Sequence, residues 1–328
     1  MRTSKTADQA KQGGTFAELA KSAVTIEELL GSAAPCLPPD VPESSLEIAR
    51  NIETTSPGRR SIPLRWSFTH AAPPGEGDST PKAPMARIIG AGGRGGGVPV
   101  KLYLALIWRA AGAPHTTNYS ARLWAELLAL PDPETKGARR VSDALRTLEQ
   151  ARLVSITRVP GEPSTVALLD ESGSGAAYQL PSTAYYHAKT LAEKAKSAER
   201  KKKFEKEMDA NLYSRLPLTL WTNGHIQAMS SAALAMLLIL MSNSRASEGK
   251  EIWWSTQKFP ERYGISPATR ARGTSELQAR GLLKVTKRLV ANSPNNTRAL
   301  TSKKVRSIYT LINDAKLSDS ASQPDSST

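Results

Sequence analysis

The sequence predicts a mainly α-helical protein with small antiparallel β-hairpins, an α+β fold built from two copies of one unit. Apolar residues at helical spacing give way to alternating segments twice along the chain. A weak internal repeat relates the two stretches, and proline, glycine and serine dominate the regions outside them. We expect a flexible arm over 1–97, a first unit over 98–180, a charged connector helix over 181–213, a second unit over 214–315 and a disordered tail over 316–328.

The predicted arm is rich in proline and glycine. Prolines cluster at 35–42 and again at 73–84, and glycines fill most of 90–97. Such a composition buries too little apolar surface to offset the entropy lost on ordering. One short helix is expected over 15–30, and the glycine run lacks the Lys-Ser/Thr pair of a phosphate-binding loop. We therefore predict a linker at 90–97 and an arm that is a candidate to recruit a replication, partition or transcription partner.

The first predicted unit has three helices followed by a hairpin. An apolar helix covers 100–111, a second helix is capped by Ser120, and a third runs over 134–151 after a proline break. Residues 153–159 and 165–169 then alternate as two strands around a Pro-Gly turn. The next stretch, 184–211, mixes lysine and glutamate with few apolar residues, which indicates a solvated connector helix.

The second predicted unit follows the same order. Its elements are an apolar helix over 230–243, a short strand over 251–255, a helix over 256–263, a helix from the N-cap Ser266 to Arg280, and strands over 282–288 and 304–311. A shift of 129 residues lays Leu148–Arg158 over Leu277–Lys287, and lays 102–111 over 231–240. This period is too long for a solenoid and indicates two copies of one domain.

The junction at the end of the last helix carries a family resemblance. Leu277, Gly281, Leu282 and Leu283 form a Leu-x-x-x-Gly-Leu-Leu pattern before a basic alternating strand, which resembles the junction between recognition helix and wing in winged-helix DNA-binding proteins. In the first copy Arg152 replaces the glycine. The resemblance covers about 98–170 and 214–313 and implies two winged-helix domains. Their tandem layout is similar to that of plasmid and phage replication initiators.

The charge distribution favours a polyanionic partner. The formal net charge is +14, and residues 213–316 hold 16 Lys and Arg against 5 Asp and Glu. A localised basic block of this kind favours nucleic acid because neutralised phosphates release counterions, although a membrane surface attracts the same charge. The longest apolar run, 230–241, is shorter than the ~20 residues of a membrane span.

Other residue classes exclude several kinds of site. The single cysteine, Cys36, allows no internal disulfide, and the four histidines have no metal-ligand spacing. We therefore expect no metal and no cofactor. The chain has no nucleophile elbow, paired-carboxylate cluster or zinc-protease helix, so we expect that the protein is not an enzyme. The polar N-terminus has no apolar signal region, which predicts a cytoplasmic, nucleoid-associated protein.

The candidate DNA contacts lie on the third helix and the hairpin of each unit. Side chains near the start of a recognition helix reach base edges, and wing residues reach phosphates or the minor groove. In the second unit the candidates are Ser266, Thr269, Arg270, Arg272, Lys287, Arg288, Arg298, Lys303 and Lys304. In the first unit they are Lys136, Arg139, Arg140 and Arg158, with Thr135 and Asp143 in neighbouring places.

These features predict a sequence-specific double-stranded DNA-binding protein of a bacterial plasmid, phage or chromosome. A replication initiator or origin-binding protein and a transcriptional regulator remain equal alternatives. The first unit is near neutral, so DNA binding and dimerisation both remain open for it, as does a homodimer of the chain. The alternative from another class is a protein-interaction scaffold whose winged helices bind partner proteins and bind DNA only non-specifically.

Overall fold

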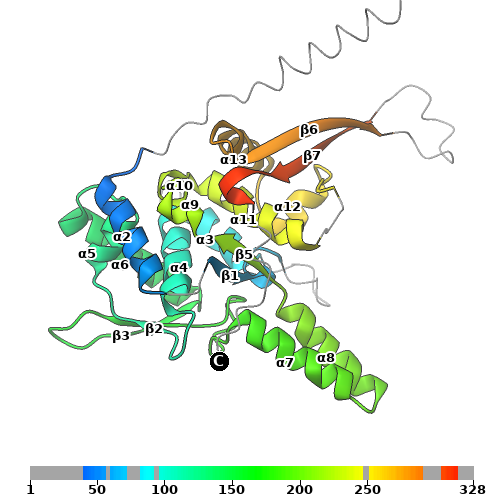
Figure 1. The fold of residues 1–328 in the computed structure, drawn as a ribbon, viewed down its shortest axis with the longest axis horizontal. Helices are drawn as coiled ribbons and strands as arrows, with labels where there is room; N and C mark the ends of the chain where they lie inside the picture. The colour runs from blue at the N-terminus through cyan, green and yellow to red at the C-terminus, as the bar shows by residue number, and fades with distance from the viewer. Residues whose placement is uncertain are drawn as a thin grey trace, which may run out of the picture. The chain divides into compact units, whose positions relative to one another are not determined.

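A computed structural model describes residues 40–56, 60–71, 82–91, 96–246, 251–290 and 304–316. Within these residues the fold is mainly helical, with three small antiparallel sheets, which confirms the predicted fold class at that level (Figure 1). The predicted helix over 15–30, the glycine linker core at 92–95, the wing tip at 291–303 and the tail from 317 lie outside the described residues.

The first unit has three helices and a three-stranded sheet. Its elements are α4 (Gly97–Ala110), β2 (Thr116–Thr117), α5 (Ala121–Leu127), the π turn η3 (Pro133–Gly137), α6 (Ala138–Gln150), β3 (Val154–Thr157) and β4 (Thr165–Leu168). The sheet order is β2-β4-β3, antiparallel throughout. Ser120 caps α5 as predicted, because its hydroxyl accepts a hydrogen bond from the Leu123 amide at 3.3 Å.

The second unit repeats this order with a reduced first strand. Its elements are α11 (Ser231–Ala246), α12 (Lys258–Tyr263), α13 (Pro267–Ala279), β6 (Leu283–Val290) and β7 (Lys304–Leu311). The strand predicted over 251–255 is reduced to one antiparallel bridge between Ile252 and Tyr309. That bridge occupies the position that the pairing of β2 with β4 has in the first unit.

The backbone carries the internal repeat more clearly than the sequence does. Both bounds of α13 lie 129 residues after those of α6. After each helix one residue adopts a left-handed conformation, Arg152 with φ 57° and Gly281 with φ 66°, and these two positions are also 129 apart. The arginine that weakens the sequence match therefore adopts the backbone conformation that glycine adopts in the other copy.

The prediction of a flexible arm over 1–97 is wrong for the described part of that segment. Its elements are α2 (Glu43–Thr54), β1 (Ser61–Arg65), the 3₁₀ turn η1 (Trp66–Phe68) and α3 (Pro84–Ala91). Ile52, Ile62, Phe68 and Met85 are buried in the core. β1 pairs antiparallel with β5 (Tyr213–Pro217).

The prolines of this segment mark the starts of helices and do not indicate a flexible arm. Pro42 precedes α2 and Pro84 opens α3, positions where the missing amide hydrogen costs nothing. The Ser45 hydroxyl also donates to the Leu127 carbonyl oxygen at 2.7 Å, which ties α2 to the end of α5. The segment therefore belongs to the folded unit.

The charged connector is two helices, not one. α7 (Pro181–Lys194) and α8 (Ala198–Ala210) pack against each other as a hairpin. Ala195 leaves the helical conformation, and the Ser197 hydroxyl accepts from the Arg200 amide at 3.3 Å to start the second helix. No residue of α8 is buried, so the expectation of a solvated segment holds for that helix.

The two repeated units share one core and are not separated by the connector. All described residues belong to one compact unit, Leu37–Thr328, and α4 packs against α11. Two short helices precede α11, namely α9 (Thr219–Thr222) and α10 (His225–Ala228). Trp108 of α4 and Trp221 of α9 lie with ring centroids 5.8 Å apart, and Lys101 donates to the Gln227 carbonyl oxygen at 2.7 Å. The relative position of the two units is therefore fixed by packing.

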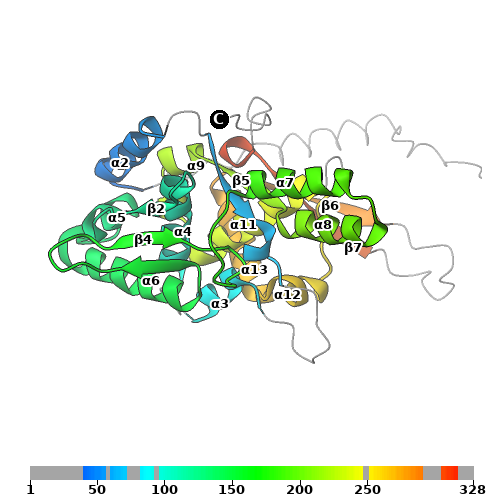
Figure 2. The same ribbon diagram turned by 90° about the horizontal axis from the view of Figure 1, so that it is seen from below.

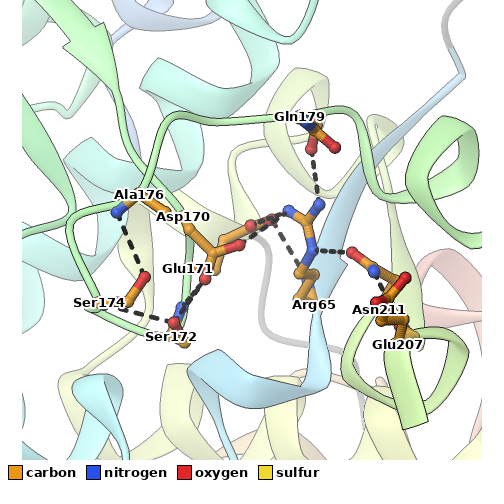
Figure 3. Close-up of polar contacts among 9 residues, drawn as sticks. All are labelled: Arg65, Asp170, Glu171, Ser172, Ser174, Ala176, Gln179, Glu207 and Asn211. Carbon is orange, nitrogen blue, oxygen red and sulfur yellow. Dashed lines mark hydrogen bonds and ion pairs between the residues drawn. The ribbon is translucent and has the colours of Figure 1, made fainter. Parts of the chain in front are cut away.

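A buried arginine joins several segments at the base of the α7–α8 hairpin (Figure 3). Arg65, at the end of β1, forms an ion pair with Glu171, and its Nη2 donates to the Gln179 carbonyl oxygen at 2.8 Å. Its Nε donates to the Asn211 side chain at 2.9 Å. Because Gln179 precedes α7 and Asn211 follows α8, Arg65 anchors both ends of the hairpin to the strand that the sequence prediction left in a flexible arm.

Candidate nucleic-acid interface

Helix α13 has one side against the core and one side toward solvent. Gly273 and Leu277 are buried against α11, and a Cβ at position 273 would overlap the carbonyl oxygen of Ala232. Glycine therefore lets α13 approach the α11 backbone closely. The outward side carries Ala268, Ala271, Arg272, Ser275 and Gln278, which are exposed. Figure 1 shows α13 beside the start of β6.

Ser266 and Thr269 form the start of α13. The Ser266 hydroxyl accepts from the Thr269 amide at 3.1 Å, which confirms the predicted N-cap, and it lies 2.9 Å from the Thr269 hydroxyl. Ser266 is exposed and Thr269 is half-buried. The Ser266 hydroxyl therefore caps the helix, and the Thr269 hydroxyl lies beside it; both residues were predicted to contact DNA.

Arg270 does not project outward as the sequence predicted. Its guanidinium donates to the Tyr309 hydroxyl at 2.9 Å and lies 4.6 Å from the ring centroid of Phe259. The rings of Trp254 and Tyr309 lie at 5.7 and 5.5 Å. Arg270 is therefore half-buried in an aromatic cluster between α12, α13 and β7. Arg272, in contrast, is exposed.

The hairpin β6–β7 carries further exposed cations. Lys287 and Arg288 are exposed as predicted, and Arg288 forms an ion pair with Glu251 at 2.5 Å. Two cations here were not among the predicted contacts: Lys284, which is exposed on β6, and Arg306, whose guanidinium lies 3.8 Å from the ring centroid of Trp253. Both lie in the alternating segments from which the strands were predicted, and their basic side chains in those segments could have identified them as candidate contacts.

For three of the predicted DNA contacts in the hairpin, the side chain is not described. Lys304 opens β7, and its backbone pairs with Val290. Arg298 and Lys303 lie outside the described residues.

The first unit exposes a smaller set of cations. Lys136 in η3 and Arg139 and Arg140 in α6 are exposed, and within the described ranges none of the three has an ion-pair partner. The other arginines nearby are neutralised: Arg158 pairs with Glu149 at 3.5 Å, Arg122 with Glu134 at 3.0 Å and Arg146 with Asp143 at 2.6 Å. The cations available to a ligand are therefore at the start of α6.

The third helices of both units lie within electrostatic reach of one buried lysine. Burial lowers the pKa of Lys101 to about 8; Glu276 opposes the shift, while Arg280 at the end of α13 and Arg140 of α6 add to it. The Arg280 guanidinium also donates to the Ala228 carbonyl oxygen at 2.7 Å. Figure 2 shows α6 beside α4 and α13 beside α11, the arrangement through which both helices reach this lysine.

Other kinds of site find little support in the described part of the chain. No group of three or more His, Cys, Asp or Glu side chains is placed to hold a metal ion there. None of the helices described is long and apolar enough to cross a bilayer.

A groove of about 300 Å³ lies between α12, α13 and β7, beside the outward side of α13.

Comparison of the chain with known protein families, with curated proteins and with solved structures found no match. The functional interpretation therefore depends on the fold and on the surface of α13, β6 and β7.

Proposed function

We propose that the protein binds double-stranded DNA sequence-specifically through two winged-helix units. The order helix, strand, helix, helix, hairpin supports this assignment, with a single bridge in place of the strand in the second unit, as does the sheet order β2-β4-β3 of the first unit. In such a unit the third helix enters the major groove and the hairpin lies over the neighbouring backbone. The third helices are α6 and α13.

The observation that carries the proposal is the outward side of α13. Arg272, Ser275 and Gln278 are exposed there with no carboxylate among them. Arginine bridges the O6 and N7 atoms of guanine, and glutamine bridges the N6 and N7 atoms of adenine, each pair being worth ~1–3 kcal/mol of discrimination. Lys284 and Lys287 of the adjoining hairpin supply phosphate contacts. Of the residues first predicted for recognition on this helix, namely Ser266, Thr269, Arg270 and Arg272, the proposal keeps Arg272 and adds the exposed Ser275 and Gln278.

The shared core adds a geometric constraint to the proposal. Because α4 and α11 pack together, the two third helices cannot change their spacing freely. One chain then requires two half-sites at a fixed separation, as a replication initiator on an array of repeats or a transcriptional regulator at its own promoter does. The nucleoid is the place of action in both cases, and no catalytic step is proposed.

The test is selection of bound fragments from random duplex DNA at about 150 mM salt. The full chain is expected to recover a motif, and Arg272→Ala is expected to recover the same motif with one position relaxed. Arg50→Gln is the matched control, because Arg50 is an exposed arginine on α2 paired with Glu43 at 2.7 Å. Recovery of no motif, with weak binding that disappears as salt rises, would favour the protein-interaction scaffold instead.

A further inference from the structure

The lining of the groove beside α13 includes one cation and several hydroxyls. These belong to Thr256, which precedes α12, to Arg270, Thr274 and Ser275 of α13, and to Tyr309 of β7. No aspartate or glutamate is among the described residues that line it. A surface with one guanidinium, several hydroxyl donors and no carboxylate favours an oxyanion.

Arg270 is half-buried and donates one hydrogen bond to a described side chain. The guanidinium carbon lies 4.6 Å from the ring centroid of Phe259, and the Tyr309 hydroxyl accepts from one N–H at 2.9 Å. A guanidinium has five N–H donors in its plane. Among the residues that the structure describes, no carboxylate pairs with Arg270. The aromatic cluster therefore fixes the orientation of an unneutralised cation.

One hydroxyl of the groove lining has no partner among the described residues. The Thr274 hydroxyl oxygen is buried and has no hydrogen-bond partner among the described residues. Thr256 and Ser275 are exposed at the rim. A buried hydroxyl without a partner costs free energy unless a ligand satisfies it.

The groove adjoins the side of α13 that we assign to base recognition. Ser275 and Gln278 belong both to the groove lining and to the outward side of the helix. A DNA strand whose bases meet that side would therefore bring its backbone past the groove. On this basis, and resting on the proposed function, we infer that the groove binds one backbone phosphate of the DNA, with Arg270 as its cation.

Two measurements on the full chain test this site. The first is the salt dependence of duplex binding: loss of one phosphate contact lowers the slope of log K against log salt by ~0.9. We expect Arg270→Gln to lower the slope by that amount while the selected motif stays unchanged. The second replaces single phosphates of the selected duplex by neutral methylphosphonates. One replacement is expected to weaken the wild type and to have no further effect on Arg270→Gln.

A second variant covers the risk that Arg270→Gln fails to fold. Thr256 is exposed, so Thr256→Val leaves the aromatic cluster intact and is expected to weaken binding to the same methylphosphonate-sensitive position. Arg50→Gln, on α2, is the charge-matched control and is expected to keep both the slope and the methylphosphonate pattern.

The outcomes separate this inference from the proposed function. A wild type that selects a motif, with no phosphate whose effect depends on Arg270 or Thr256, overturns the groove site but leaves DNA recognition standing. A wild type without salt-dependent duplex binding overturns the proposed function and this inference together. A third outcome is that inorganic phosphate alone raises the melting temperature of the wild type but not of Arg270→Gln, while no methylphosphonate has an effect. That result would assign the groove to a small free anion and would also overturn the inference.

Discussion

Arg65 and Glu171 form an ion pair whose side chains are only 3% and 0% exposed. Arg65 ends β1, and Glu171 follows β4, so the pair joins the N-terminal segment to the first repeated unit (Figure 3). Burial raises the pKa of Glu171 to about 7, although the charge of Arg65 opposes that rise. The pair is thus a costly arrangement that is stable only while both partners are present.

Arg65→Met is expected to lower the free energy of unfolding by about 3 kcal/mol or more, because it leaves a carboxyl group buried without its cation. Chemical denaturation at pH 8 measures the loss. Arg50→Gln, which breaks an exposed pair, is expected to change stability by less than about 1 kcal/mol. Equal effects of the two variants would mean that the Arg65 cluster does not anchor the N-terminal segment.

Gly273→Ala is expected to destabilise the fold although alanine is the better helix former. Alanine gains about 1 kcal/mol of helix propensity over glycine, but here its Cβ would overlap the Ala232 carbonyl oxygen and come within 2.7 Å of the Met236 side chain. We expect a net loss of about 2 kcal/mol in urea denaturation, from displacement of α13. Gly90→Ala in α3 is the control: a Cβ there meets nothing within 4 Å, so stability is expected to rise by up to about 1 kcal/mol.

The repeated unit could be predicted from the sequence because its signals are local. Apolar spacing, strand alternation and the caps at Ser120 and Ser266 each involve neighbouring residues, and the structure has the corresponding helices and strands. The left-handed residue after α6 could not be predicted, because an arginine occupies it. Packing over the whole unit holds Arg152 in a conformation that glycine adopts more easily.

The N-terminal segment could not be predicted because its partners are remote. β1 is five residues long and, among the described strands, pairs with β5 alone, so Ile62 lies opposite Leu216, far along the chain. A composition averaged over 97 residues conceals such a strand among prolines and glycines. The same reason explains the shared core: the contact between Trp108 and Trp221 has no local signature.

The site was only partly predictable because α13 has a weak apolar stripe. Its buried face consists of Gly273 and Leu277, with Arg270 folded onto aromatic rings of α12 and β7. Nothing in the sequence distinguishes the inward Arg270 from the outward Arg272. The inward direction is decided by Phe259 and Tyr309, which approach only when the unit has folded.

His70 is expected to make the fold less stable in mild acid. Burial, helped by the charge of Arg262, lowers its pKa to about 4, although the backbone hydrogen bond at Trp66 opposes this shift. The unfolded chain has the ordinary pKa of 6.5 and binds the proton first, so stability is lost as pH falls from about 6.5 to about 4. Between pH 7.5 and 5 the loss due to His70 is about 2 kcal/mol.

His70→Gln tests this assignment through the pH dependence of urea unfolding. Between pH 7.5 and 5 the stability of the variant is expected to change more favourably than that of the wild type, by about 2 kcal/mol. The pH dependence that remains has contributions of both signs: burial lowers the pKa of His225 against the opposing effect of Asp314, which costs stability in acid, whereas the raised pKa of Glu171, about 7, adds stability as pH falls. Parallel curves for the wild type and the variant would show that His70 titrates alike in the folded and unfolded chains.

The first unit is expected to contact DNA through the start of α6. Arg139 and Arg140 are exposed and without ion-pair partners in the described ranges, so Arg139→Gln combined with Arg140→Gln should lower the slope of log K against log salt by about 1.8. The charge-matched control combines Arg50→Gln on α2 with Lys189→Gln on α7, and its slope should match the wild type. An unchanged slope in the α6 variant, with a lower molar mass in sedimentation, would assign this surface to dimerisation instead.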